Sequence, residues 1–179
     1  YLASPLNLLL LIFPKSLVME CFSLIYFIKI GLAGLSFAWF LRKRFNNYCL
    51  SVTVFGCCYA LRSFVIGYAW NIMWLDCIIL LPLILLGLER LVKGGKPYLY
   101  CLALGASILS NYYISIMICL FMVIYFICLL ILEGKRRARA FFFSLVQFGG
   151  YSLIAGALAA FVLLPEIAAL QRTASGDFN

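Results

Sequence analysis

An uncharged segment from Tyr98 to Leu132, YLYCLALGASILSNYYISIMICLFMVIYFICLLIL, is the most informative part of this sequence. As one helix it would be about 50 Å long at about 1.5 Å per residue, too long for a single crossing of a hydrocarbon core about 30 Å thick. The polar run from Ser110 to Tyr113 offers a natural break, and its first leg, Pro97 to Leu109, is then only about 20 Å long. Because non-helical backbone inside a bilayer is tolerated only beside protein or a water-filled cavity, this break predicts a cavity.

The composition of the whole chain also indicates a membrane protein. Of its 179 residues, 66% are apolar and 11% are charged, and there is no His. A soluble domain carries about a quarter charged residues, so the composition excludes a soluble enzyme. The lack of His removes the usual general base and the commonest zinc ligand. The eight cysteines lie in apolar runs without CxxC spacing, so we expect buried free thiols rather than disulfides or a metal cage.

The net charge of +8 gathers in clusters between the apolar spans. The clusters are Arg42-Lys43-Arg44, then Arg90, Lys93 and Lys96, then Lys135-Arg136-Arg137 with Arg139. Such clusters indicate membrane topology rather than nucleic-acid binding. If short basic loops stay in the cytoplasm, all three clusters lie on that side, and each segment between them crosses out and returns.

The sequence therefore predicts an all-α fold, a polytopic transmembrane helical bundle of about six crossings that includes one short or broken hairpin. The expected crossings are Leu17–Leu41, Val52–Tyr68, Leu75–Leu91, Pro97–Leu109, the second leg ending at Leu132, and Ala140–Leu164. The apolar piece Pro5–Phe13 is too short to span and should be an interfacial or re-entrant helix. Pro82 should kink its helix. We treat residues 1–179 as a single transmembrane domain and expect it to be a fragment of a longer membrane protein, truncated at both ends.

Two ionisable residues inside predicted spans, Arg62 and Asp76, need partners or water. In one interpretation they pair with each other and fix the register of their hairpin. In the other, one of them faces a cavity and handles a phosphate, which suits the planar fork of Arg. Lys29 lies deep in the first crossing and should face the bundle interior, and Glu89 can pair with Lys93 one helical turn away.

Aromatic and amide side chains gather around both outer hairpin tips. They are Tyr68, Trp70, Trp74, Tyr112 and Tyr113, with Asn71 and Asn111 beside them. Aromatic rings at these positions are typical of an interfacial belt. The same set also suits a sugar-binding cleft, in which rings stack on the sugar and amides bind its hydroxyl groups. The residues by themselves leave both interpretations open.

Several strings in this chain resemble the YfhO family of bacterial membrane proteins. They are Ser4-Pro5-Leu6-Asn7-Leu8-Leu9, Gly34-Leu35-Ser36-Phe37-Ala38, Tyr68-Ala69-Trp70-Asn71-Ile72-Met73-Trp74-Leu75-Asp76, Leu109-Ser110-Asn111-Tyr112-Tyr113 and Thr173-Ala174-Ser175-Gly176-Asp177-Phe178. The resemblance implies a GT-C-type glycosyltransferase that takes a sugar from a polyprenyl-phosphate carrier and transfers it to a cell-envelope polymer, such as teichoic acid, outside the membrane. It also implies an acidic catalytic residue upstream of Tyr1, so no catalytic residue, metal ligand or covalent cofactor is assigned here.

On this basis Arg62 would contact the carrier phosphate and Asp76 would orient Arg62 or the acceptor. The expected sugar-site residues are Asn71, Asn111, Tyr112 and Tyr113, with Tyr68, Trp70 and Trp74 as further substrate-binding residues. The expected partners are membrane lipid, the lipid-linked sugar and the polymer, in a multi-pass protein of the bacterial plasma membrane. Two alternatives remain: a transporter or flippase, suggested by the break at Asn111 and the buried charges, and a structural unit of a membrane complex.

Overall fold

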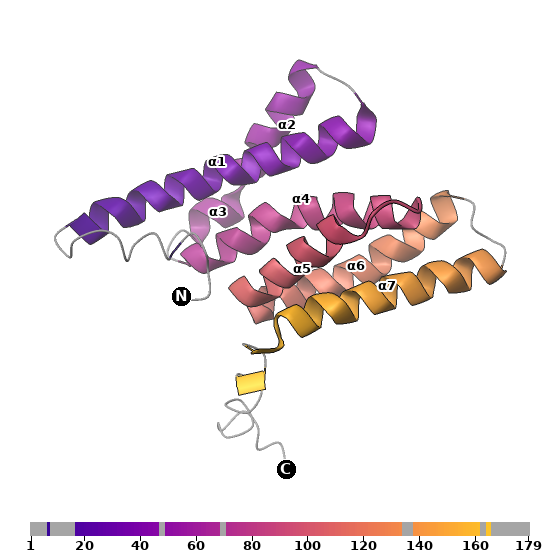
Figure 1. Cartoon of the computed structure of the whole chain (residues 1–179). Coiled ribbons are helices and arrows are strands. Elements are labelled where there is room, and N and C mark those ends of the chain that lie inside the picture. The colour runs from indigo at the N-terminus through magenta and orange to yellow at the C-terminus, as the bar shows by residue number, and fades with distance from the viewer. Residues whose placement is uncertain are drawn as a thin grey trace, which may run out of the picture.

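The computed structural model describes residue 7 and residues 17–46, 49–68, 71–133, 138–161 and 164–165. Within these ranges the chain is helical and contains no strand. The helices are α1 (Val18–Phe45), α2 (Leu50–Ala60), α3 (Ser63–Gly67), α4 (Ile72–Val92), α5 (Tyr98–Ser110), α6 (Tyr112–Leu132) and α7 (Ala138–Leu158) (Figure 1). The prediction of an all-α membrane bundle is confirmed.

Four stretches are long and apolar enough to cross a membrane, namely α1, α4, α6 and Phe141–Leu158 of α7, and the apolar helices α2 and α5 are shorter. These six helices match the six predicted crossings, with one difference. The leg expected as one helix over Val52–Tyr68 is interrupted at Leu61 and Arg62, so α3 is separate. The hydroxyl of Tyr26 on α1 donates to the Val65 carbonyl at 3.1 Å and supports the backbone beyond this break.

The predicted break in the second hairpin is confirmed. Helix α5 ends at Ser110, Asn111 is extended with φ −162° and ψ 109°, and α6 begins at Tyr112. The side-chain oxygen of Asn111 accepts a hydrogen bond from the Ile114 N–H at 3.1 Å. Asn111 is therefore the N-cap of α6, which satisfies one of the backbone donors that a helix start leaves open.

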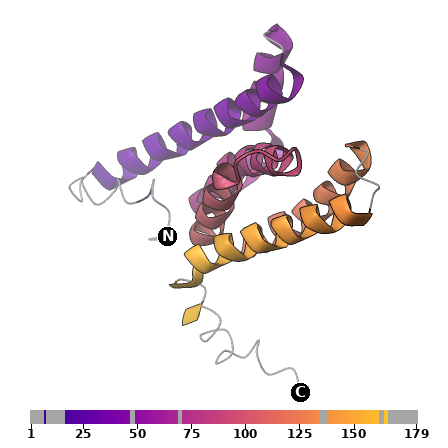
Figure 2. The ribbon, with the colours of Figure 1, turned by 45° about the vertical axis from the view of Figure 1, so that its right-hand side comes forward.

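Helix α4 lies at the centre of the bundle and packs against α1, α5, α6 and α7. Figure 2 shows the central helices between α1 and α7. One hydrophobic core, which includes Leu88 and Leu104, lies between α4 and helices α5 to α7. A second core, which includes Ala33, Val65 and Ile72, lies between α4 and helices α1 and α3. Because α4 contributes to both cores, it is apolar on nearly every side.

Glycines set the closest helix contacts. A Cβ at Gly87 of α4 would lie 2.6 Å from the backbone nitrogen of Tyr100 on α5. A Cβ at Gly34 of α1 would lie 3.2 Å from the carbonyl oxygen of Gly56 on α2. Small residues at such crossings let helix backbones approach closely, and close packing is the main attraction between helices in lipid.

The C-termini of α1, α4 and α6 form one end of the bundle, which we call the basic end because Arg42, Lys43, Arg44, Arg90 and Lys93 lie there (Figure 1, right). Arg44 Nη1 lies 3.2 Å from Glu89 Oε2, and Lys93 Nζ lies 3.5 Å from Glu133 Oε1. The predicted Glu89–Lys93 pair is therefore wrong, because α1 and α6 bring closer partners. The predicted grouping of the first two basic clusters is confirmed, whereas residues 134–137 lie outside the described residues.

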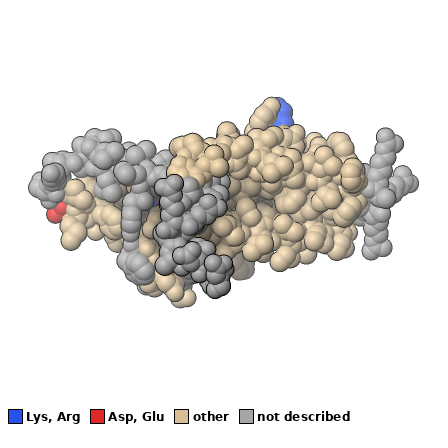
Figure 3. All heavy atoms as spheres, turned by 90° about the horizontal axis from the view of Figure 1, so that it is seen from below, with Lys and Arg blue, Asp and Glu red and all other residues tan. Residues whose placement is uncertain are grey.

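Most of the described surface in Figure 3 is neither acidic nor basic. All eight cysteines are free thiols, as predicted, but their burial differs from the prediction. Cys21, Cys77 and Cys101 are buried and Cys119 is half-buried, whereas Cys49, Cys57, Cys58 and Cys128 are exposed. The exposed thiols lie on outward faces, where a membrane helix is as apolar as in its core. Apart from Asn7, the predicted segment Pro5–Phe13 lies outside the described residues.

We predict that Gly87→Ala destabilises the protein by about 1–3 kcal/mol, because the added methyl group meets the backbone of Tyr100. Gly149→Ala in α7 is the matched control, since a Cβ there meets nothing within 4 Å. The control should be unchanged or up to about 1 kcal/mol more stable. Thermal unfolding in detergent measures both, and equal stability of the two variants would contradict the packing described above.

Candidate functional site

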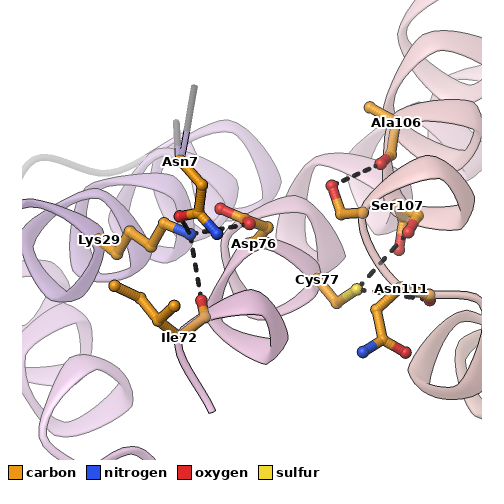
Figure 4. Close-up of polar contacts among 9 residues, drawn as sticks. Asn7, Lys29, Ile72, Asp76, Cys77, Ala106, Ser107 and Asn111 are labelled. Carbon is orange, nitrogen blue, oxygen red and sulfur yellow. Dashed lines mark hydrogen bonds and ion pairs between the residues drawn. The ribbon is translucent and has the colours of Figure 1, made fainter. Parts of the chain in front are cut away.

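A buried ion pair joins α1 to the first turns of α4. Lys29 Nζ lies 2.8 Å from Asp76 Oδ2, and it also donates to Asn7 Oδ1 at 2.9 Å and to the Ile72 carbonyl at 3.1 Å (Figure 4). The exposed fraction is 0% for Lys29 and 4% for Asp76. Lys29 thus faces the interior, as predicted. Of the two interpretations of Arg62 and Asp76, the one in which they pair with each other is wrong, because α1 places Lys29 directly against the carboxylate.

Arg62 instead lies over an aromatic ring and lines a groove. Its guanidinium carbon is 4.4 Å from the centre of the Tyr59 ring. The groove has a volume of about 360 Å³ and is lined by Arg62 with Cys77, Ile78, Leu81, Ile114, Met117 and Ile118. Arg62 is the charged member of this otherwise apolar lining from α4 and α6. An apolar groove with a cation in its lining is a chemical match for an amphiphile that has an anionic head.

Tyr59 was not among the residues singled out from the sequence. Its hydroxyl donates to the Ile78 carbonyl at 2.8 Å, and its ring stacks on Phe37 of α1 at 4.4 Å. Pro82 lies four residues after Ile78 and has no N–H, so the helix itself cannot supply a donor to that carbonyl. Pro82 was the signal in the sequence, since a buried carbonyl left open in an apolar helix requires a partner.

A small polar cluster connects α4 to the break between α5 and α6 (Figure 4). The Cys77 thiol donates to the Ser107 carbonyl at 3.6 Å and also lies 3.9 Å from the Asn111 carbonyl oxygen. The hydroxyl groups of Ser107 and Ser115 are 2.8 Å apart. Because Cys77 follows Asp76, this cluster places Asn111 at the same end of the bundle as the Lys29–Asp76 pair. The two hairpin tips therefore lie together, as the topology predicts.

The remaining predicted site residues are divided between the start of α4 and the start of α6. The rings of Tyr68 and Trp74 are 5.4 Å apart, and the N–H of buried Asn71 donates to the Tyr68 carbonyl at 2.9 Å. Tyr112 is half-buried and Tyr113 is exposed. Trp70 lies outside the described residues.

The two buried carboxylates of α4, Asp76 and Glu89, lie about 20 Å apart along the helix. Lys29 neutralises Asp76, while Arg44 and the Tyr125 hydroxyl bind Glu89. Each carboxylate is thus committed to a local partner, and they are too far apart to act as an acid–base pair. No group of three or more metal-ligating His, Cys, Asp or Glu side chains is present in the part of the chain that the structure describes.

The family model described as "Bacterial membrane protein YfhO" matches residues 1–179. No curated protein and no solved structure matches the chain.

We predict that Lys29→Met costs about 3–5 kcal/mol of stability, because it leaves the Asp76 carboxylate buried without its cation. The double variant Lys29→Met/Asp76→Leu should recover much of this loss. Lys93→Met is the control for an exposed pair, since the side chains of Lys93 and Glu133 are 53% and 33% exposed, and it should cost less than about 1 kcal/mol. Unfolding in detergent measures all three; a double variant no more stable than Lys29→Met would contradict the pairing.

We predict that Asn111→Ala destabilises the protein by about 1 kcal/mol, because α6 loses its N-cap acceptor. Asn111→Ser keeps a side-chain oxygen at the cap and should unfold at nearly the wild-type temperature. Equal losses for the Ser and Ala variants would show that the cap is not what Asn111 contributes.

Proposed function

Since the chain belongs to the YfhO family of bacterial membrane proteins, we propose that it forms part of a membrane glycosyltransferase using a polyprenyl-phosphate sugar as donor. The acceptor in this proposal is a cell-envelope polymer of the teichoic acid type. The observation that carries the proposal is the apolar groove between α4 and α6 with Arg62 in its lining.

The groove suits both halves of such a donor. Ile78, Leu81, Ile114 and Met117 offer an apolar path for isoprenyl units. The guanidinium of Arg62 offers paired donors that match two phosphate oxygens. Ionisable residues among membrane-spanning helices commonly mark substrate sites, which supports a role for Arg62 in binding the donor phosphate.

The aromatic and amide residues support a sugar site next to that phosphate. Tyr68 and Trp74 present adjacent rings, and the amide nitrogen of Asn111 is not used by the helix cap, which takes only its oxygen. With the basic end in the cytoplasm, these residues lie toward the outer face, where an envelope polymer is accessible. The proposed sugar site also includes Asn71, Tyr112 and Tyr113. Trp70 is proposed as a further substrate-binding residue.

The reaction in this proposal is a substitution at the anomeric carbon. An acceptor hydroxyl forms a new C–O bond, the bond to the phosphate oxygen breaks, and polyprenyl phosphate leaves with the electron pair. Arg62 stabilises the charge that grows on the leaving phosphate. The hydroxyl proton passes to a general base other than Asp76 and Glu89, since these two buried carboxylates of α4 already form ion pairs with Lys29 and Arg44.

A transporter or flippase is the second candidate, and the observation in its favour is the interrupted hairpin at Asn111. The break also has a structural explanation, because Asn111 caps α6 and the hydroxyl groups of Ser107 and Ser115 bond to each other beside it. The intact protein in liposomes separates the two functions. Incorporation of label from a polyprenyl-phosphate hexose into polymer supports the transferase, whereas movement of the lipid-linked sugar across the bilayer without incorporation contradicts it.

We predict that Arg62→Ala weakens the binding of polyprenyl phosphate by about 10- to 100-fold, because a charged hydrogen-bond donor is lost. Arg62→Lys keeps the charge without the planar fork and should give an intermediate loss. Binding of the neutral alcohol polyprenol should not change, and neither should binding of either lipid to Arg90→Ala, which changes an exposed cation at the basic end. Wild-type affinity of Arg62→Ala for polyprenyl phosphate would remove Arg62 from the donor site.

A further inference from the structure

We propose that Tyr59 is the positioning residue for Arg62, and that the backbone carbonyl left open by Pro82 fixes Tyr59 in place. The inference deepens the proposed function, because it rests on Arg62 binding the donor phosphate. It gives Tyr59 the orienting role that the sequence had suggested for Asp76, whose carboxylate is held by Lys29.

The anchor of Tyr59 is a consequence of backbone chemistry. In a regular helix the N–H at position 82 would donate to the carbonyl of Ile78, but Pro82 has none. The Tyr59 hydroxyl takes this place at 2.8 Å. A strong acceptor in an apolar surrounding favours one rotamer of the tyrosine, because any other rotamer leaves two polar groups without partners.

The ring of Tyr59 is fixed on its flat sides as well. Phe37 of α1 stacks on it with ring centres 4.4 Å apart and planes 9° from parallel. The guanidinium carbon of Arg62 also lies 4.4 Å from the centre of this ring. A cation held against an aromatic face away from water is attracted to it more strongly than in solution. The ring therefore holds Arg62 from one side.

Arg62 lies where regular helix stops. Helix α2 ends at Ala60, and α3 begins at Ser63, so Arg62 lies between two helices. Ile78, whose carbonyl anchors Tyr59, also lines the groove together with Arg62. The same turn of α4 thus forms a wall of the groove and fixes the residue that directs Arg62 toward it.

A double-mutant cycle tests the anchor without any substrate. Tyr59→Phe should lower the unfolding temperature of the intact protein by about 2–4 °C, since the Ile78 carbonyl loses its donor. In a Pro82→Ala background position 82 regains its N–H, so the same change should have a much smaller effect. Tyr26→Phe is the matched control, because the Tyr26 hydroxyl donates to a carbonyl unrelated to Pro82. Its effect should be the same in both backgrounds.

Lipid binding tests the positioning role. Tyr59→Leu, which removes the ring, should weaken the binding of polyprenyl phosphate about fivefold and leave the binding of polyprenol unchanged. Tyr59→Phe, which keeps the ring, should lose less affinity than Tyr59→Leu. A general loss of packing would weaken the binding of both lipids equally.

Three results would overturn the inference: an equal Tyr59→Phe effect with and without Pro82, wild-type phosphate binding by Tyr59→Leu, or equal loss of both lipids. Failure of the proposed function looks different. In that case Arg62→Ala binds polyprenyl phosphate normally, whereas the coupling between Tyr59 and Pro82 is still seen in unfolding.

Discussion

The buried contact between Lys29 and Asp76 is the interaction on which the arrangement of the bundle depends. Helices α1 and α4 both run toward the basic end, and the contact ties them near the opposite end of α4. Arg44 and Glu89 tie the same two helices again at the basic end. The two ties are about 20 Å apart along α4, so they fix register and crossing angle together. Buried ion pairs contribute little net stability compared with apolar residues. Here the two pairs select one alignment of α1 and α4, which are otherwise apolar helices.

This alignment determines what the other polar groups can do. Asp76 turns to α1, and so its charge is not available to Arg62 across the hairpin. In the same register, the open carbonyl of Ile78 faces α2, where the Tyr59 hydroxyl reaches it at 2.8 Å. The Tyr59 ring on α2, which is held by the Ile78 carbonyl, lies against the guanidinium of Arg62.

Hydropathy and basic clusters were sufficient to predict the spans, the break at Asn111 and the common end of the first two clusters. Those features follow from the thickness of the bilayer and from local polarity. The partner of Asp76 could not be predicted in the same way, because α1 is far from α4 in sequence. Arg62 is nearer in sequence and was expected on the other leg of the same hairpin, so it was the more obvious partner. The division between α2 and α3 was also missed, since an apolar run with one Arg gives no strong breaker signal. Pro82 did carry usable information: it implies an open carbonyl at Ile78, although not which side chain would fill it.

The breaks in regular helix explain why the candidate site lies where it does. Backbone that leaves the helix inside a membrane must find partners within the protein. Within the short helix α3, the Val65 carbonyl accepts a hydrogen bond from the Tyr26 hydroxyl, and at the break before α6, Asn111 caps the new helix. In each of these contacts, a polar side chain completes the hydrogen bonding of the backbone. Arg62 lies at the break between α2 and α3, with its guanidinium over the Tyr59 ring and in the lining of the apolar groove. In the function proposed above, the apolar residues of this groove would contact the isoprenyl chain of the donor and Arg62 would contact its phosphate.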